Sequence, residues 1–313
     1  MANANFDTVL STTLNKHRAA LVDAVFEARP LAFMVKQAGN IRMVDGGAKI
    51  VEPTIVADDT TVGSYSGADT LTTTHLDELS ASEWDWKQMA VSVNITGIEE
   101  AKNMGGPRVL DLVEAKIQIA TESLIKEMNS EFHGDGSGNS GKDWEGLGNL
   151  VAGHANDTSV GGINPTTNAY WATYRNAVAG VLTEAAMKTA FHTVSVGNDT
   201  PNVIITDQDE FEAYETLVQS NLRYHQTEVG DAGFMTIAYK GVPMFFDQDC
   251  TAGSMYFLNT KYLKLIGHSQ KWFTSTPFVK PTNQDIRIAQ ILAYGNLICN
   301  NRRMQGVLTG LTD

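Results

Sequence analysis

The stretch PRVLDLVEAKIQIATESLIKEMNSEF, from Pro107 to Phe132, decides how the rest of the sequence is interpreted. Apolar residues recur in it at spacings of three and four, which places these residues on one face of a helix: Leu110, Val113, Ile117, Ala120, Leu124 and Met128. Pro107 suits the first helical turn, and His133-Gly134 is a stop signal. At 1.5 Å per residue the helix is roughly 39 Å long, and a typical helix has about 11–12 residues. We predict one long helix over 107–132 with a buried apolar face.

A long polar segment precedes this helix and separates two predicted strands. Residues 49–56 resemble a strand, and in residues 88–95 apolar side chains such as Val91 and Val93 alternate with polar ones. Residues 57–87 between them are rich in Ser, Thr, Asp and Gly. A loop of this length is rare within a compact domain unless it is functional or disordered.

Two tryptophans, Trp84 and Trp86, lie on the polar side of the second strand's alternation, at its far end. Tryptophans placed away from a core often anchor a partner surface, so both are candidates for a contact between subunits. The alternative is that both rings fold back onto their own loop.

The remaining segments predict a mixture of helices and strands without βαβ alternation, which indicates the α+β class. Residues 6–28 and 30–37 are helix-like, and further helices are predicted over 183–193 and 208–220. The predicted strands cover 202–206, 235–239, 242–246, 254–258, 262–266, 286–293 and 297–300.

Composition excludes several classes of protein. The net charge of −13 argues against a general nucleic-acid-binding protein, because neutralising phosphates needs a basic surface. No apolar run approaches the ~18 residues needed to span a bilayer, and the N-terminus lacks a signal-peptide pattern, so no membrane partner is expected. Cys250 and Cys299 are the only cysteines and form no CxxC, so we expect two buried thiols.

The charges are unevenly distributed. Residues 57–87 contain seven acidic residues and one basic residue, a net −6, and Asp77 and Glu78 lie in the middle of this run. Residues 261–303 contain seven basic residues and one acidic residue, a net +6; they include Lys271, Lys280 and Arg287. Opposite charges on distant segments suggest that the acidic loop of one subunit contacts the basic segment of another.

Known catalytic and metal-binding patterns are absent, so we predict no catalytic residue, no metal site and no cofactor. The loop 134–141 is glycine-rich but follows a helix and lacks the Lys-Ser/Thr ending of a phosphate loop. It also lacks the turn glycine and the final glutamate of a calcium loop. Paired carboxylates at 207/209 and 247/249 leave a soluble carboxylate-dependent hydrolase as an alternative.

The order of these parts resembles the major capsid (coat) proteins of tailed bacteriophages, the Hong Kong phage type of fold. The resemblance rests on "Gly-Gly then strand" at 46–56, the long loop, a "Val-x-Ile-Thr-Gly" return ending at Gly97, and Asn103-x-Gly-Gly-Pro before the helix. "Gly-Leu-Gly-Asn-Leu-Val" at 146–151, "Tyr-Lys-Gly-Val-Pro-Met" at 239–244 and "Tyr-Phe-Leu-Asn-Thr-Lys-Tyr-Leu" at 256–263 continue it.

The resemblance implies a layout and a set of partners. Residues 1–45 would be an N-terminal arm, and residues 46–150 the extended β-hairpin loop (57–87) and a peripheral domain with the spine helix. Residues 151–313 would form the axial domain, with part of 262–290 returning to the peripheral domain. The arm and the loop would reach onto neighbouring subunits. The chain would assemble with itself into hexamers and pentamers of an icosahedral virion shell, put together in the host cytoplasm, which encloses double-stranded DNA without reading its sequence.

The sequence also bears on three further features of this family: the scaffold, the covalent cross-link and the non-viral members. The loop begins after only 56 residues, which implies a separate scaffolding protein; a portal would be a further partner, and decoration proteins are left open. The loop tip has no lysine and Lys87 lies only at its base, so no covalent cross-link between subunits is expected. A shell protein of a non-viral nanocompartment would have the same fold and remains an alternative.

Overall fold

A computed structural model describes most of the chain, and every structural statement below concerns its described residues. These are 29–55, 61–71, 79–102, 106–151, 159–218 and 236–312. The helix predicted over 6–28 lies outside them. Within these ranges no helix is long and apolar enough to cross a membrane.

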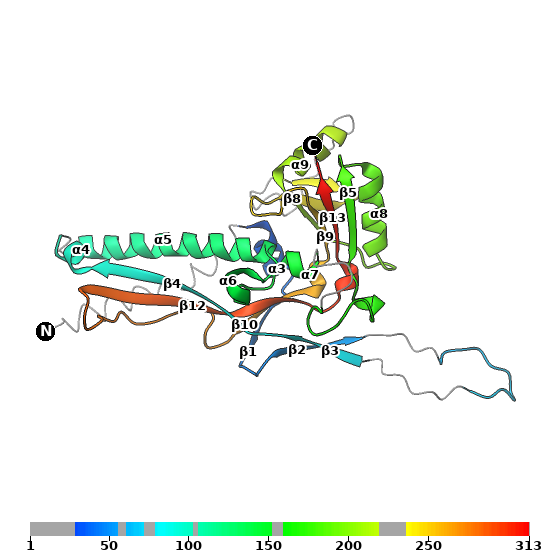
Figure 1. Ribbon diagram of the computed structural model, residues 1–313, viewed down its shortest axis with the longest axis horizontal. Helices are drawn as coiled ribbons and strands as arrows, with labels where there is room; N and C mark the ends of the chain where they lie inside the picture. Colours follow the sequence, from blue (N-terminus) through cyan, green and yellow to red (C-terminus); the bar gives the residue numbers. More distant parts are fainter. Residues whose placement is uncertain are drawn as a thin grey trace.

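The predicted long helix is confirmed as α5, Gly106–His133, with 28 residues and a length of about 42 Å. Four residues of its predicted apolar face are buried: Ile117, Ala120, Leu124 and Met128. The side chains of Leu110 and Val113 lie outside the described set. In Figure 1, α5 runs lengthwise along the strands β4 and β12.

The first sheet has the strand order β1-β10-β12-β11, with β4 also paired to β12. Its strands are β1 Ile41–Val44, β4 Lys87–Thr96, β10 Leu263–His268, β11 Thr274–Ser275 and β12 Ile286–Cys299. On β4 the side chains of Met89, Val93 and Ile95 are buried, as the alternation predicted. The two strands predicted over 286–293 and 297–300 are one 14-residue strand. Gly295 lets it continue, because a Cβ there would lie 2.3 Å from the Ile266 carbonyl oxygen of β10.

The second sheet has the order β5-β13-β9-β6-β8-β7. Its strands are β5 Tyr174–Gly180, β6 Val203–Thr206, β7 Thr236–Tyr239, β8 Val242–Phe246, β9 Met255–Leu258 and β13 Gly306–Leu311. Helix α8, Glu184–Val194, packs against β5 and β13, and α9, Gln208–Val218, packs against β8. The sequence did not predict β5 or β13, because β5 is nowhere fully buried and two glycines interrupt β13.

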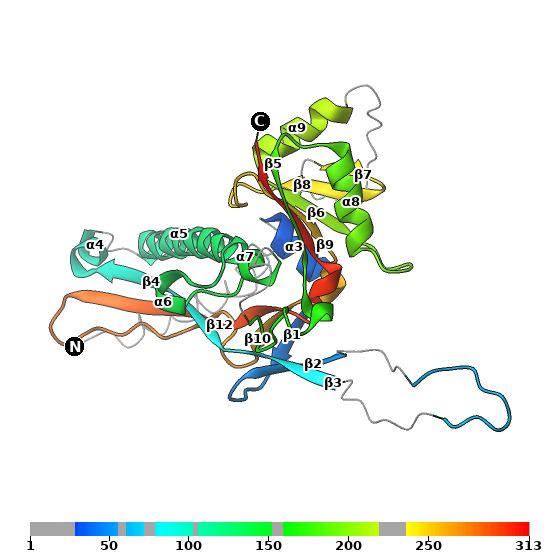
Figure 2. The same ribbon diagram turned by 45° about the vertical axis from the view of Figure 1, so that its right-hand side comes forward.

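A two-stranded hairpin projects from the body and pairs β2, Ile50–Ile55, with β3, Leu79–Trp84. Residues 79–84 of the segment predicted as a loop over 57–87 are therefore strand. Figure 2 shows that the hairpin and the described part of its loop, residues 61–71, extend away from both sheets.

The described part of the predicted N-terminal arm belongs to the core of its own subunit. Helix α3, Pro30–Gln37, buries Leu31, Met34 and Val35, and β1 pairs in parallel with β10. Residues 30–44 are therefore anchored on their own subunit, and a contact of the arm with a neighbouring subunit remains a prediction. The cause of the anchoring is the hydrophobic effect, because the short apolar run after Pro30 finds enough apolar surface within its own chain.

Short helices complete the connections between these elements. They are α4 Gly97–Lys102, α6 Gly138–Gly141, α7 Leu147–Leu150, and the 3₁₀ turns η1 Ala169–Trp171, η3 Thr260–Tyr262 and η4 Arg302–Met304.

The burial of α5 gives a first prediction. Replacing Ile117, which is 4% exposed, by Asp buries an unpaired carboxylate and should lower the free energy of unfolding by several kcal/mol. The matched control is Ile119→Asp on the same helix, where the side chain is 63% exposed and the change should cost little. Urea unfolding of both variants measures the difference, and equal stabilities would contradict the burial of this face.

Candidate assembly site

The β2–β3 hairpin has one buried face and one exposed face. The exposed face carries apolar side chains that its own subunit does not cover: Val51 is 55% exposed and Leu79 is 75% exposed. The buried face is packed on the subunit, with Ile50 in the same apolar cluster as Ile266 of β10. Its buried side chains are Ile50, Glu52 and Thr54 of β2 and Ser82 and Trp84 of β3.

Trp84 belongs to this buried face and is only 3% exposed. A Cβ at Gly161 would lie 2.7 Å from the indole ring, and the indole Nε1 donates a hydrogen bond to Ser82 Oγ at 3.1 Å. The expectation of an intersubunit contact at Trp84 is therefore wrong, and the alternative, a ring packed within its own subunit, applies. The alternation of β4 does not extend to Trp84, because residues 85 and 86 are not in a strand. Odd-numbered side chains point inward in β4, whereas the even-numbered Ser82 and Trp84 point inward in β3.

Trp86 lies in this break and is half-buried. Its Nε1 donates to the Gly47 carbonyl oxygen at 2.9 Å, and its ring centroid is 5.7 Å from that of His268. It also lines a surface hollow of about 460 Å³ together with Asp85 and Lys87. An intersubunit contact at Trp86 remains a prediction.

The described part of the loop, residues 61–71, exposes three large apolar side chains. Val62 is 84% exposed, Tyr65 is 68% exposed and Leu71 is 57% exposed. Exposed apolar groups gathered on a projecting segment are typical of protein–protein contacts. The acidic candidates Asp77 and Glu78 lie outside the described residues.

The basic segment 261–303 presents less charge to a partner than its net +6 predicted. Lys261 pairs with Asp199 at 3.2 Å and Lys264 with Glu52 at 2.9 Å, two acids outside the segment. Lys280 pairs with Asp285 at 2.6 Å, the acid already counted in the net charge.

Of the other basic residues in this segment, Arg302 is 1% exposed and donates from Nε to the Leu150 carbonyl oxygen. Arg287 is half-buried in β12, whereas Lys271 is exposed. Folding thus uses several of these charges inside the subunit, and a role for Lys271, Lys280 and Arg287 between subunits remains a prediction.

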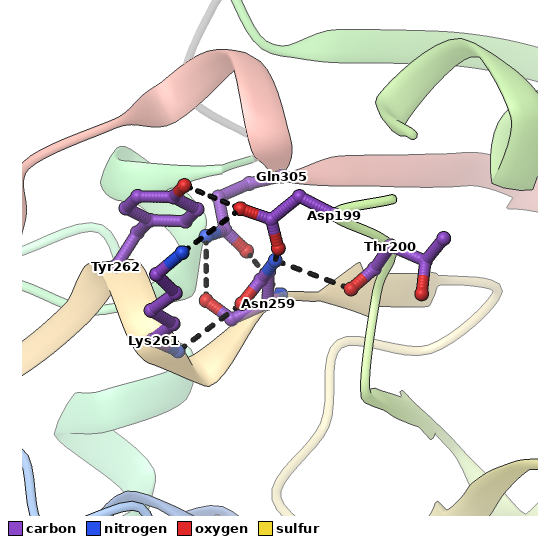
Figure 3. A network of polar contacts seen from close by, with 6 residues as sticks. All are labelled: Asp199, Thr200, Asn259, Lys261, Tyr262 and Gln305. Atoms are coloured by element: carbon purple, nitrogen blue, oxygen red, sulfur yellow. Dashed lines mark hydrogen bonds and ion pairs between the residues drawn. The ribbon is translucent and has the colours of Figure 1, made fainter. Parts of the chain in front are cut away.

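The chain crosses between the two sheets at η3 and again at η4, and a polar network ties these crossings together (Figure 3). Gln305 accepts from the Asn259 backbone N–H and donates to the Asn259 carbonyl oxygen, both at 2.9 Å. Asp199 accepts from the Asn259 side chain at 2.8 Å and from the Tyr262 hydroxyl at 2.5 Å. The hydrogen bond from Tyr262, with those from Asn259 and Lys261, holds the pKa of Asp199 below its usual value.

The carboxylate pairs considered for a hydrolase have structural roles. Asp207 Oδ2 accepts from the Gly253 N–H at 2.8 Å, and Asp207 Oδ1 accepts from the Glu210 N–H in the first turn of α9. Asp247 lies 3.3 Å from His133 Nε2 and accepts from Asn129 at 3.0 Å, which joins the end of α5 to the turn after β8.

Asp247 is 2% exposed. Burial alone would raise its pKa, but the bonds from His133, Asp249 N–H and Asn129 lower it below its usual value. In the described part of the chain, no three His, Cys, Asp or Glu side chains could together hold a metal ion. Asp207, Asp247 and Asp249 are thus engaged in folding contacts, whereas Asp209 is exposed.

Glu131, in the last turn of α5, is the most perturbed acid at this end of the helix. Its Oε2 accepts from the Trp144 backbone N–H at 3.0 Å and thereby holds the loop after α5. Burial raises the pKa of Glu131 to about 7, and the nearby charges of Asp143 and Glu127 act in the same direction.

This raised pKa gives a second prediction. A carboxyl whose pKa is higher in the folded than in the unfolded protein is disfavoured when charged, so its contribution to stability is lost as the pH rises from about 4.5 to about 7. Because the carboxyl is partly exposed, solvent weakens the penalty for its charge, and Glu131→Gln should raise the free energy of unfolding by about 2 kcal/mol at pH 8 and have little effect at pH 4. Urea unfolding at both pH values measures this; a variant destabilised at pH 8 would contradict it.

The different environments of the two tryptophans give a third prediction. Trp84→Ala removes a buried ring and should lower the free energy of unfolding by about 3–5 kcal/mol. Trp86→Ala is the matched variant two residues away, and the smaller buried area should make its cost about 1 kcal/mol. Thermal and urea unfolding of the two variants measure the difference. Equal losses would mean that Trp86 is as much part of the core as Trp84.

Comparison with known proteins identifies the fold but not a sequence family. No protein-family model matches the chain, and no curated protein matches it. The capsid of cyanophage A-1(L) is 17% identical with a TM-score of 0.72, covering 90% of this chain and 92% of that one. The capsid of a native GTA particle is 9% identical with a TM-score of 0.63, covering 89% and 90%.

The fold also occurs outside phage heads. The SrpI encapsulin of Synechococcus elongatus is 11% identical with a TM-score of 0.60 and covers 89% of this chain and 87% of that one. The sequence identities are low, but each likeness extends over nearly the whole of both chains. The chain therefore has the fold of the major capsid proteins of tailed bacteriophages, the Hong Kong phage type, as the sequence resemblance implied.

Proposed function

We propose that this protein is the major capsid protein of a tailed bacteriophage, whose copies form hexamers and pentamers of an icosahedral shell around double-stranded DNA. The observation that carries the proposal is the projecting hairpin, whose exposed face and loop tip present apolar side chains that the subunit itself leaves uncovered. An exposed apolar surface on a hairpin that projects from the body is suited to binding a neighbouring copy of the chain. The likeness to phage capsid proteins over nine-tenths of the chain supports the same function.

The remaining parts of the proposal follow from the same layout. The function is structural and needs no catalytic residue. The first sheet with α5 is the peripheral domain, and the second sheet is the axial domain around the capsomer axes. A separate scaffolding protein, a portal and optional decoration proteins are the further partners, and the site of action is the virion, with assembly in the host cytoplasm.

A shell protein of a non-viral nanocompartment is the second candidate, because the SrpI encapsulin has the same fold. The two candidates differ in what sets the curvature of the shell. If the chain closes its own shell, we expect closed particles of one size from the chain alone; if it depends on a separate scaffold, we expect capsomers, tubes or irregular shells.

A fourth prediction tests assembly directly. We expect negative-stain electron microscopy of the chain, expressed alone, to show capsomers or shells. Lys271→Glu should lower the yield of capsomers or shells at about 0.1 M salt, where the Debye length is about 10 Å. At about 1 M salt the Debye length is about 3 Å, and the yields of variant and wild type should be equal. The matched control is Lys188→Glu on α8, an exposed lysine outside the basic segment.

Discrete monomers or dimers at every concentration would contradict both candidates. Uniform closed shells would favour the nanocompartment. If Lys271→Glu assembles as well as the wild type at low salt, the basic segment does not guide the contact.

A further inference from the structure

The base of the hairpin contains a buried acid that is held by two cations from two different strands. Glu52 of β2 is 4% exposed. Its Oε1 accepts from Arg42 Nη1 of β1 at 2.8 Å, and its Oε2 accepts from Lys264 Nζ of β10 at 2.9 Å. Each carboxylate oxygen of the hairpin is thus bound to a different strand of the first sheet.

An acid is a poor choice at this position if stability alone matters. Taking a carboxylate and its cations out of water is costly, and replacing such a buried cluster as a whole by apolar side chains of similar volume often stabilises as well or better. The hydrophobic effect, however, is non-directional, whereas charge-assisted hydrogen bonds require a defined distance and angle. Because Arg42 and Lys264 approach the carboxylate from separate strands, a rotation of the hairpin about its base lengthens at least one of the two bonds.

Because Glu52 lies at the base of the hairpin, a small rotation of the hairpin at this point displaces its far end by a larger distance. The stem of β2 has six residues, which is about 20 Å at 3.3 Å per residue, and the described loop residues lie further out (Figure 2). A tilt of about 10° at the base moves the end of such a stem by about 3 Å, enough to break side-chain packing in an interface.

We propose that Glu52 is a positioning residue that sets the direction in which the hairpin leaves the subunit. In a shell, which is the function proposed above, this direction sets where the loop tip meets the neighbouring copy and therefore the curvature of the assembly. The role of Glu52 in setting the hairpin direction concerns the isolated subunit, and it can be tested whether or not the protein forms a shell.

The same hairpin offers a matched control on its other face. Glu83 of β3 pairs with Lys49 at 3.0 Å, but both side chains are about half exposed. An exposed pair of this kind contributes little. Substituting Glu83 changes the charge of the hairpin by the same amount as substituting Glu52, without affecting its contact with β1 and β10.

The test compares Glu52→Met with Glu83→Met in the isolated full-length subunit. Spin labels at Ser80→Cys, in exposed β3, and at Ser123→Cys, on the exposed face of α5, report the hairpin direction by double electron–electron resonance. The two native thiols are buried, so the labels attach to the introduced cysteines. We expect a broadened or shifted distance distribution for Glu52→Met and an unchanged one for Glu83→Met. Glu52→Met also leaves Lys264, whose side chain is 25% exposed, without its partner, so its melting temperature should fall, whereas that of Glu83→Met should not.

Arg42→Gln provides a second variant that keeps the fold, because the Arg42 side chain is 62% exposed and its removal leaves no buried cation. It breaks one of the two bonds and should broaden the distribution by less than Glu52→Met. Arg42→Gln should broaden the distribution without lowering the melting temperature. An unchanged distribution in both variants would overturn the proposal, and so would a broadening seen only in Glu52→Met together with a lowered melting temperature, because that pattern indicates a stabilising rather than a positioning role.

Electron microscopy of the same variants separates this inference from the proposed function. Shells of altered or mixed size from Glu52→Met, with wild-type shells from Glu83→Met, support both. If the wild type forms no shells, the proposed function fails, and the distance distributions still decide whether Glu52 positions the hairpin. Normal shells despite a broadened distribution overturn the role of Glu52 in shell curvature.

Discussion

The packing of α5 along the first sheet is the constraint on which the rest of the molecule depends. A helix of 28 residues can bury a continuous apolar stripe only against a partner of similar length, and β4 and the 14-residue β12 provide it. Both strands are much longer than the usual five or six residues. The body is elongated for this reason, and the crossings to the second sheet lie at one end of it (Figure 1).

Polar bonds act together with an apolar cluster that includes residues of both sheets, and they fix the two sheets relative to each other at these crossings. Asn259 and Gln305 exchange two hydrogen bonds where the chain passes between the sheets, and the buried guanidinium of Arg302 donates to the carbonyl oxygens of Leu150 and Trp171. Such bonds have a preferred geometry, so they define an orientation that apolar contacts alone leave loose. At the end of α5 the hydrogen bond from Asn129 to Asp247 does the same for the helix and the turn after β8.

The hairpin combines an anchored base with an uncovered surface. Its inner face is held by Glu52, by Trp84 against Gly161, and by the Glu83 N–H bonded to the Gly161 carbonyl oxygen. Its outer face and loop tip expose apolar side chains such as Val51 and Tyr65. A rigid base with an apolar, exposed end is suited to an element that contacts another molecule rather than its own body.

The sequence by itself determined the features that depend on local periodicity and turn chemistry. The stripe in α5, the alternation of β4 and the helix after Pro30 were predicted correctly, because side chains three or four residues apart, or two apart, share a face whatever lies opposite. Only the tertiary structure decided what lies opposite. The inward turn of Trp84, the burial of Glu52 between two cations and the pairing of Lys261 and Lys264 within the chain depend on contacts between residues distant in sequence or across a strand break. Local patterns carry no information about such partners. The charge totals and the two tryptophans therefore predicted intersubunit contacts, although the fold places some of these side chains in contacts within the subunit.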